Sequence, residues 1–167
     1  MEDIIIRRMN IEDSEAVTDI LISSWQTAYR GIVSDEHLDN MDRPSLVERR
    51  RKQYKDYIVA VSAGEVVGYC WYVNDSSFTN DVSDIDSEVV ALYVKPELKR
   101  HGVGGKMLSY AIDDLKKQDR KRMIIWCLKE NTPSRMFYES MGGTIVGEHK
   151  IHIGNQDYDE VGFLYTL

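Results

Sequence analysis

The sequence predicts an α/β fold of the α+β type, with its elements in the order β-α-α-β-β-β-α-β-α-β-β. Two observations support this prediction. Short runs rich in β-branched and aromatic residues recur along the chain, and stretches with apolar residues at helical spacing separate them. The chain has 167 residues and contains neither an internal repeat nor a linker. We therefore expect one domain that spans residues 1–167, because this is about the length of a single globular domain.

The first third of the chain is predicted to form one strand and two helical regions. Residues 4–8 predict the strand, and Asn10 with Asp13 three residues later predicts a helix cap. Apolar residues then recur at helical spacing until Gly31. The second helical region covers residues 34–54, and we expect it to restart near Asp42-Arg43-Pro44, since proline is favoured in a first helical turn.

A hairpin and a polar loop follow. Residues 57–62 and 66–73 are β-branched and aromatic runs, and the Ala63-Gly64-Glu65 segment between them predicts a hairpin turn. Residues 74–87 are polar and contain Asp75, Asp81, Asp84 and Asp86. These acids lack the ligand spacing and the glycine of a calcium loop. The segment is therefore interpreted as a solvated loop that could rim a pocket.

The remainder of the chain alternates strands and helices. Gly142 is expected to end a short helix, and Gly154-Asn155 is a turn signal between two strands. The longer helix carries its apolar residues on one face. Strands are expected at residues 88–94, 123–128, 144–151 and 158–167, and helices at residues 102–117 and 133–141.

Composition and charge narrow the class of protein. The formal net charge of -7 argues against a nucleic-acid partner, because phosphate contacts need clustered Lys and Arg. The acidic start of the chain does not resemble a secretory leader, and no apolar stretch has the length of a membrane helix. Cys70 and Cys127 each lie beside a tryptophan in an apolar stretch and are expected to be buried, reduced thiols. We expect a cytoplasmic protein with no membrane contact.

A basic, glycine-containing turn stands out against this acidic background. Residues 95–106 hold four Lys or Arg and one acid, and they connect a predicted strand directly to a predicted helix. A helix start presents unpaired N–H groups and the positive end of the helix dipole, which together suit a phosphate. Met107 excludes two common phosphate motifs, because a dinucleotide fingerprint needs Gly or Ala there and a Walker loop needs Ser or Thr. A purely structural helix entrance remains the alternative.

Two segments of the chain resemble the GNAT superfamily of N-acetyltransferases, and the element order extends the resemblance over the whole chain. Residues 88–97 (EVVALYVKPE) and 99–104 (KRHGVG) look like the acetyl-CoA strand and pyrophosphate loop of that family, and residues 131–143 (NTPSRMFYESMGG) are similar to its second signature. Two departures occur. Lys99 stands where the family usually has Gln or Arg, which keeps the charge without the planar fork, and Gly143 replaces a common aromatic.

The resemblance implies a central mixed sheet of about seven strands that splays between the fourth and fifth strands. The pantetheine arm of acetyl-CoA would lie between those strands, paired with the exposed backbone around Leu92, Tyr93 and Val94. Asn131 would hydrogen-bond the cofactor from the other side, although it could equally be an ordinary helix cap. The pyrophosphate would bind at Lys99, Arg100, His101, Gly102, Val103, Gly104 and Gly105.

The resemblance also implies two residues that act on protons. Tyr138 would be the general acid beside the cofactor sulfur, with a core aromatic as the alternative reading. Glu88 would remove the proton of the acceptor ammonium, with a solvated strand-end charge as the alternative. An alkyl ammonium with a pKa near 10.4 is rarely neutral at pH 7, which is a handicap of roughly 4 to 5 kcal/mol.

The acceptor pocket is expected around Trp25 and Tyr29, with Tyr72 and Trp126 as possible further walls. Aromatic side chains there could bind a cation, although core packing of Trp25 is the competing reading. The histidines form no ligand set with the cysteines, so no metal is expected.

The predicted function is the acetylation of a small-molecule primary amine by direct transfer from acetyl-CoA in a ternary complex. A non-catalytic acyl-CoA binding or sensing module would keep the glycine turn but need neither Tyr138 nor Glu88. A protein N-terminal or lysine acetyltransferase would need an open peptide groove near residues 24–38. A homodimer remains open at this level.

Overall fold

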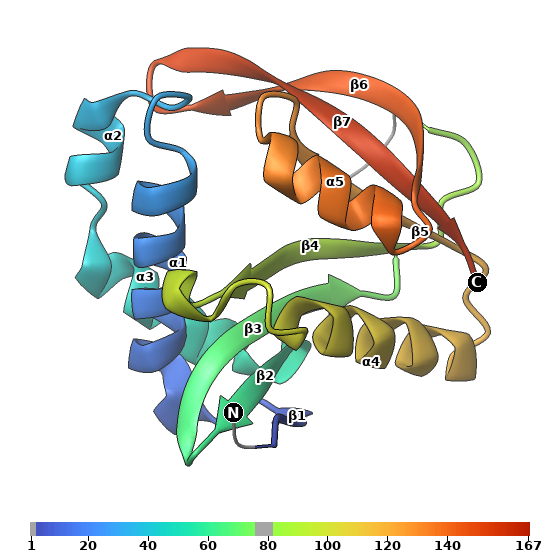
Figure 1. The fold of residues 1–167 in the computed structure, drawn as a ribbon, viewed down its shortest axis with the longest axis horizontal. Helices are drawn as coiled ribbons and strands as arrows, with labels where there is room; N and C mark the ends of the chain where they lie inside the picture. The colour runs from blue at the N-terminus through green and yellow to red at the C-terminus, as the bar shows by residue number, and fades with distance from the viewer. Residues whose placement is uncertain (1–2, 76–81) are drawn as a thin grey trace.

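The computed structural model describes residues 3–75 and 82–167, and its elements follow the predicted order (Figure 1). Asp81 of the predicted polar loop lies outside the described residues. The strands are β1 (Ile5–Arg8), β2 (Tyr57–Ser62), β3 (Glu65–Val73), β4 (Ser87–Val94), β5 (Arg122–Leu128), β6 (Thr144–Ile153) and β7 (Gln156–Thr166). The helices are α1 (Ser14–Ala28), α2 (Asp35–Asp39), α3 (Arg43–Gln53), α4 (Val103–Lys117) and α5 (Thr132–Ser140).

The second helical region is two separate helices, because each has its own cap. The Ser34 hydroxyl accepts a hydrogen bond from the His37 amide at 3.3 Å and begins α2. The Asp42 carboxylate accepts one from the Ser45 amide at 3.2 Å and begins α3, with Pro44 in its first turn. The expected restart near residue 42 is confirmed, and three helices rather than two precede β2.

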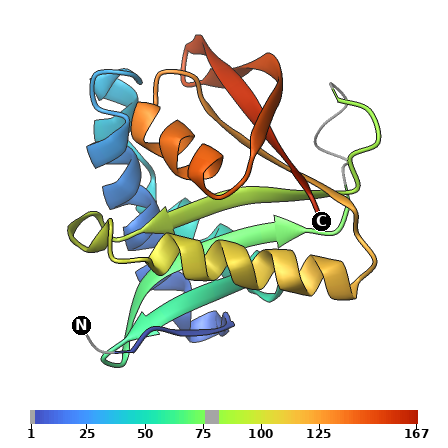
Figure 2. The ribbon, with the colours of Figure 1, turned by 45° about the vertical axis from the view of Figure 1, so that its right-hand side comes forward.

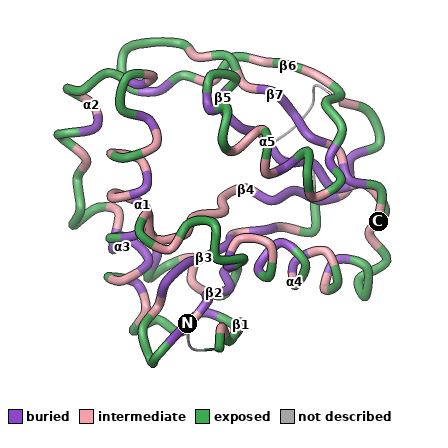
Figure 3. Tube along the Cα trace, viewed as in Figure 1, coloured by how far each residue is buried: buried purple, intermediate pink, exposed green. Residues whose placement is uncertain are grey.

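All seven strands form one mixed sheet in the order β1-β2-β3-β4-β5-β7-β6. Neighbouring strands are antiparallel except β4 and β5, which are parallel. Helix α4 lies on one face of the sheet, whereas α1 and α3 lie on the other (Figures 1 and 2). Two apolar clusters cover the two faces: the α4 cluster is built around Met107 and Leu108, and the α1 cluster around Val17 and Ile20. Strand β2 contributes to both, since Ile58 and Ala60 pack in the α4 cluster while Tyr57 and Val59 pack in the α1 cluster. The buried residues accordingly follow the central strands (Figure 3).

Strands β4 and β5 separate after only three paired residues. The pairs are Ser87 with Met123, Glu88 with Ile124 and Val89 with Ile125. A bulge coincides with this point, because Trp71 of β3 pairs with Ala91 while Tyr72 pairs with Val89, which leaves Val90 as the extra residue. A bulge bends its strand and increases the local twist. The predicted splay is therefore confirmed, and we call residues 90–94 of β4 and 126–128 of β5 the splayed segment.

The bulge also changes which residues of β4 face each layer. Val89 packs in the α4 cluster before the bulge, and Leu92 and Val94 do so after it. Ala91 and Tyr93 pack in the α1 cluster. The splayed segment thus turns the Tyr93 side chain toward α1 and the Leu92 side chain toward α4.

The β6–β7 hairpin closes one end of the sheet against α1 and α2. Its turn contains Gly154 in the left-handed region, with φ of +63°, and a Cβ there would lie 3.1 Å from His37 Nδ1. A third apolar cluster beneath this contact contains Tyr29, Val33, Leu38, Leu128 and Ile153. The α1–α2 connection and the hairpin tip are therefore packed together.

Candidate active site

The predicted phosphate turn has an unusual backbone. Gly102 is the N-cap of α4 with φ of +82°, and Arg100, a non-glycine residue, has φ of +68°. A residue with a Cβ in the left-handed region costs roughly 1 to 2 kcal/mol. The turn therefore holds a specific path that the surrounding structure must stabilise, a pattern that is enriched at ligand sites.

The amides at the start of α4 are available to a ligand. The first bond within the helix joins the Lys106 amide to the Gly102 carbonyl at 3.1 Å. Among the residues that the structure describes, no acceptor pairs with the amides of Val103, Gly104 or Gly105. The first turn of α4 contains no acidic residue, and the exposed side chains of Lys99 and Lys106 add positive charge. This arrangement suits an anion of phosphate type.

The glycines of the turn also let α4 and α5 approach each other. A Cβ added at Gly104 would lie 3.3 Å from Phe137 Cζ, which is tighter than most real contacts. A Cβ added at Gly105 would lie 3.8 Å from Met141, an ordinary contact. A shallow depression of about 540 Å³ runs along this side of α4 and reaches Met141. Gly104 is therefore constrained by helix packing as well as by its open backbone.

Asn131 caps α5. Its side-chain oxygen accepts a hydrogen bond from the Ser134 amide at 3.4 Å, and the residue is buried. The helix-cap reading of Asn131 is thus present in the structure. The cap uses the oxygen only, so the amide group of the same side chain can still donate to a ligand.

Tyr138 of α5 lies in the core cluster below α4, with its ring against Phe163 at 5.8 Å between centroids. Burial raises the pKa of Tyr138 well above its ordinary value, and nearby Tyr93 and Cys127 add to the rise. Within the described part of the chain, no group accepts a hydrogen bond from its hydroxyl. Tyr138 is therefore a protonated donor without a protein acceptor, positioned beside the splayed segment.

The departure at Gly143 has a structural reason that the sequence did not reveal. A Cβ at Gly143 would lie 2.8 Å from Cζ of Tyr165, so any larger residue would displace that ring from its present position. The Tyr165 hydroxyl donates to the Tyr138 backbone carbonyl at 2.6 Å. Tyr165 of β7 thus places an aromatic ring at the end of α5. Family members usually have an aromatic residue at the position of Gly143 instead.

Trp25, Tyr29 and Tyr93 meet on the α1 side of the splayed segment. The Trp25 indole N–H donates to the Tyr93 hydroxyl at 3.0 Å, and the Tyr29 and Tyr93 hydroxyl oxygens are 3.3 Å apart. The rings of Trp25 and Tyr29 also contact edge to face, with centroids 5.0 Å apart. Trp25 is therefore both packed and hydrogen-bonded, and Tyr93 contributes its side chain here as well as its backbone to β4.

Tyr72 is not brought together with the other predicted acceptor residues. Its hydroxyl donates to Asp114 of α4 at 2.6 Å, and its ring faces the Arg8 guanidinium at 5.6 Å. Side chains alternate along β3, so Trp71 faces α1 and Tyr72 faces α4. The expectation that Tyr72 lines the same pocket as Trp25 is corrected accordingly.

Glu88 lies in the paired part of β4, opposite Ile124 of β5. Because Val89 faces α4, Glu88 faces the α1 side, where the predicted acceptor residues lie. Its exposed fraction is only 6%. The alternative of a solvated strand-end charge does not fit this burial.

Trp126, a predicted wall of the acceptor pocket, lies against His149, whose pairing with Glu160 sequence reasoning missed. Its ring stacks on His149 with centroids 3.7 Å apart and lies over Gly162, where a Cβ would be 2.9 Å from the indole. His149 Nε2 is in turn 2.8 Å from a carboxylate oxygen of Glu160. Burial raises the pKa of Glu160, and the hydrogen bond with His149 opposes part of that rise.

The sequence did contain a signal for this group. Counting outward from the two-residue turn at Gly154-Asn155 places Ile153 opposite Gln156, and the same count places His149 opposite Glu160. Cross-strand neighbours in an antiparallel pair have their Cβ atoms about 5 Å apart.

The described residues contain neither a candidate metal site nor a helix that could span a membrane. No group of three or more His, Cys, Asp or Glu residues in ranges 3–75 and 82–167 could hold a metal ion. No helix in the same ranges is long and apolar enough to cross a membrane. Cys70 and Cys127 are free and buried.

Comparisons with known proteins bear on this arrangement. The chain is similar to the "Uncharacterized N-acetyltransferase YuaI" of Bacillus subtilis, with 24% identity over 94% of this chain and 90% of the relative. It is also similar to spermidine N(1)-acetyltransferase of Thermoplasma acidophilum, with 24% identity over 82% of this chain and 86% of the relative. The crystal structure of PaiA N-acetyltransferase from Thermoplasma acidophilum in complex with coenzyme A has the same fold, with a TM-score of 0.73, 20% identity and 99% coverage of both chains.

A model of the acetyltransferase (GNAT) family matches residues 15–143, which include β4, the glycine turn, α4 and α5. The match covers well over half of the chain, and the relatives are named as N-acetyltransferases. With its splayed strands and its open turn of amides, this chain is an acyltransferase that belongs to the GNAT family.

Proposed function

We propose that this protein is a single acetyltransferase domain that moves an acetyl group from acetyl-CoA directly to the primary amine of a small molecule. The observation that carries the proposal is the splayed segment, which leads to unpaired amides at one end. The Tyr138 hydroxyl lies on one side of it, and the Trp25, Tyr29 and Tyr93 group lies on the other. A thioester could therefore reach the splayed segment from the Tyr138 side and an amine from the Trp25 side.

The donor side fits coenzyme A. The pyrophosphate would accept hydrogen bonds from the amides of residues 103–105, with Lys99, Arg100, His101 and Lys106 as surrounding cations. The pantetheine amides would pair with the backbone of residues 92–94, as an added strand does at a free sheet edge. The Asn131 amide group is a further donor. The related PaiA structure, which holds coenzyme A, supports this assignment.

In the proposed reaction, a neutral amine attacks the thioester carbonyl and coenzyme A leaves as a thiolate. Negative charge appears on the sulfur only as the bond breaks, so a hydrogen bond from Tyr138 stabilises the transition state more than the bound donor. The raised pKa of Tyr138 keeps that hydroxyl protonated and able to donate. A carboxylate on the α1 side would draw a proton from the acceptor ammonium, directly or through water, and Glu88 is the candidate that the sequence indicates.

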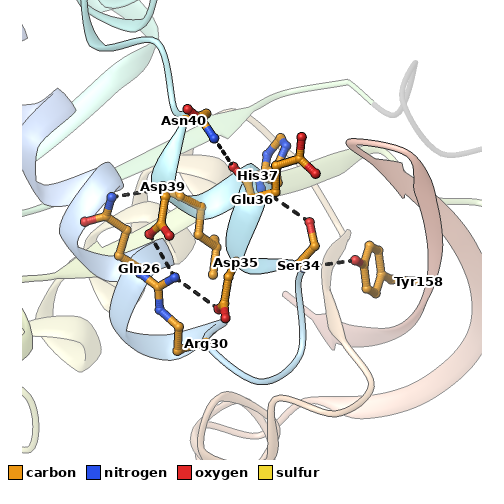
Figure 4. Close-up of polar contacts among 10 residues, drawn as sticks. Gln26, Arg30, Ser34, Asp35, Glu36, His37, Asp39, Asn40 and Tyr158 are labelled. Atoms are coloured by element: carbon orange, nitrogen blue, oxygen red, sulfur yellow. Dashed lines mark hydrogen bonds and ion pairs between the residues drawn. The ribbon is translucent and has the colours of Figure 1, made fainter.

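The closed end of the sheet favours a small acceptor over a protein. The Ser34 amide is 3.4 Å from the Tyr158 hydroxyl of β7, and Arg30 pairs with Asp35 and Asp39 of α2 (Figure 4). The Gln26 side chain also donates to the Leu38 carbonyl. These contacts hold residues 26–39 together and against β7, in the region where a protein acceptor would need an open groove. The spermidine acetyltransferase named among the relatives is consistent with a small amine.

A non-catalytic acyl-CoA module is the second candidate, and the Tyr138 hydroxyl argues against it. The Tyr138 side chain packs in the core, yet its hydroxyl has no hydrogen-bond partner among the described residues. A module that only holds coenzyme A would not need this hydroxyl, because phenylalanine would pack in the same space.

The test is release of free thiol from acetyl-CoA in the presence of single amines. The panel contains spermidine, butylamine, an amino-acid amide, an aminoglycoside and a lysine-containing peptide, with an acceptor-free reaction as the control. We expect thiol release that depends on a small amine and a product whose mass is increased by one acetyl group. Release with the peptide alone would establish a protein acetyltransferase. Binding of acetyl-CoA without release for any acceptor would establish the non-catalytic module.

A further inference from the structure

The β6–β7 hairpin carries two pairs of the same chemistry in opposite environments. His149 Nε2 is 2.8 Å from Glu160, and His152 Nδ1 is 2.8 Å from Asp157. The two pairs are three rungs apart in the ladder and therefore point to opposite faces. The side chains of His152 and Asp157 are 66% and 59% exposed, whereas those of His149 and Glu160 are 24% and 12% exposed.

Stability alone does not explain the less exposed pair, His149 and Glu160. Moving a carboxylate out of water is unfavourable, and a buried ion pair seldom recovers the whole cost. Val161 and Phe163 on the other face of β7 show that apolar residues are used where only packing is needed. The largely buried position of the Glu160 side chain thus needs another reason.

The surroundings of Glu160 connect it to the splayed segment. Glu160 is paired with Leu128, the last residue of β5. Burial raises the pKa of Tyr29 on α1, Tyr93 on β4 and Cys127 on β5, and the nearby Glu160 carboxylate adds to the rise in all three. Its charge therefore reaches α1 and both strands that part from each other.

The Tyr138 hydroxyl lies on the other side of the same residues. Tyr93 and Cys127, whose pKa values Glu160 raises, both add in turn to the raised pKa of Tyr138. Cys127 and Tyr138 pack in the α4 cluster, whereas Glu160 alternates with Val161 and so faces α1. An acceptor near Glu160 and a thioester sulfur near Tyr138 would thus meet across the splayed segment.

We propose that Glu160, oriented by His149, is the carboxylate that binds the acceptor's ammonium group and takes its proton, so that the acceptor is a cationic primary alkylamine. This inference deepens the proposed function and rests on it. Glu160 would touch the substrate and be a catalytic residue. His149 acts through Glu160 and is a positioning residue, with its ring plane fixed by the stack on Trp126.

Glu160 is better situated for this role than Glu88. Glu88 is level with Ile124, in the paired part of β4 and β5. Glu160 is level with Leu128, four residues and about 13 Å further along β5, at the open end of the splayed segment.

The proton balance is complete without another reactant. The ammonium R–NH3⁺ gives one proton to the Glu160 carboxylate, which later releases it to water. The free amine forms the C–N bond as the C–S bond breaks, and the nitrogen then loses a second proton. The thiolate, which is stabilised by the hydrogen bond from Tyr138, takes up one proton, so the products are the amide R–NH–acetyl, coenzyme A thiol and one proton.

The test compares Glu160→Gln with Asp157→Asn, its matched control on the outer face. Acceptor kcat/KM is measured from pH 6 to 9 with the amines of the panel, and acetyl-CoA affinity is measured by calorimetry. We expect Glu160→Gln to lower kcat/KM about 100-fold or more at neutral pH and to lose the acidic limb of the wild-type profile. Acetyl-CoA affinity should stay within about twofold, and Asp157→Asn should match the wild type.

His149→Ala supplies a readout that a structural role would not move. Because the hydrogen bond from His149 lowers the pKa of Glu160, its loss should shift the acidic limb of the profile to higher pH, while His152→Ala should leave it in place. If Glu160→Gln fails to fold in a thermal melt, Glu160→Asp with this pH readout takes its place.

The outcomes separate the two levels of the proposal. If the wild type acetylates an amine of the panel and folded Glu160→Gln shows the same rate and the same pH profile, the role of Glu160 is overturned. The proposed function then still stands. A wild-type protein that acetylates no amine of the panel overturns the proposed function, and the role of Glu160 with it.

Discussion

Tyr138 and Tyr165 offer a paired test, because their hydroxyl groups are in opposite situations. The Tyr138 hydroxyl has no acceptor among the described residues, so Tyr138→Phe removes no intramolecular hydrogen bond. The Tyr165 hydroxyl donates to the Tyr138 carbonyl at 2.6 Å, so Tyr165→Phe removes one. We expect the first change to affect turnover and the second to affect stability.

The magnitudes follow from the contacts. Loss of the Tyr165 hydrogen bond should cost about 1 kcal/mol, at the low end for a buried pair, because the Tyr138 carbonyl keeps a second donor in the Gly143 amide at 3.0 Å. In a domain of this size that corresponds to a Tm lower by about 2 to 4 °C. Tyr138→Phe should leave Tm unchanged or raise it slightly, and should lower turnover by about 100-fold, the lower end for a positioned acid.

The assays are a thermal melt, calorimetry with acetyl-CoA and steady-state kinetics for each variant. Acetyl-CoA affinity should be nearly unchanged in Tyr138→Phe, since the charge that its hydroxyl stabilises is absent from the bound donor. Full turnover of Tyr138→Phe would remove the residue from the mechanism. A lower Tm in Tyr138→Phe than in Tyr165→Phe would refute the assignment of the two hydroxyl groups.

Three further predictions concern the donor turn, Glu88 and Glu160. Gly104→Val should both weaken coenzyme A binding and lower Tm, since the added side chain would press on Phe137. Lys99→Ala should cost at most about 2 kcal/mol of coenzyme A affinity. Calorimetry that finds an unchanged affinity in Gly104→Val would contradict the assignment of the turn. Glu88→Gln tests the competing assignment: if Glu88 rather than Glu160 takes the acceptor proton, this variant should lose most turnover at neutral pH and recover as pH approaches the amine pKa, whereas an equal loss at every pH in the kinetics would point to a structural role. Burial raises the folded-state pKa of Glu160 above its ordinary 4.5, so its contribution to stability is full below pH 4.5 and is lost as pH rises through the folded pKa. Urea unfolding should therefore show the wild type losing stability relative to Glu160→Gln over that interval, and a constant difference would contradict the burial argument.

The features that the sequence predicts well are those determined by neighbouring residues. The hairpin at Ala63-Gly64, the caps at Asn10 and Asp42, and the end of a helix at Gly142 all depend on local backbone preferences, and each occurs as expected. The glycine turn is local in the same sense. The roles of Glu88 and Tyr138 stay predictions until the variants are measured.

The features that the sequence did not reveal depend on pairing between distant residues. The bulge at Val90 exists only relative to β3, and it decides that Tyr93 faces α1. Tyr72 was grouped with Trp25 by residue type, whereas strand alternation places it against α4. Glu160 becomes notable only once the register brings His149 opposite it.

The three-residue seam between β4 and β5 has a consequence for motion. In the described part of the chain, the strand pairing between the β1–β4 part of the sheet and the β5–β7 part covers only residues 87–89 and 123–125, extended by one hydrogen bond from the Asp86 amide to the Arg122 carbonyl. Beyond the seam, the two parts are held by side-chain packing, which resists sliding less sharply than a hydrogen-bonded ladder. A ligand that pairs with the free edge of β4 and also contacts β5 would restrict the motion of the two parts relative to each other. Binding of coenzyme A stabilises the whole fold by mass action and should slow amide hydrogen exchange in the remote β1–β2 pair by that amount. We expect exchange in the splayed segment to slow by a larger factor.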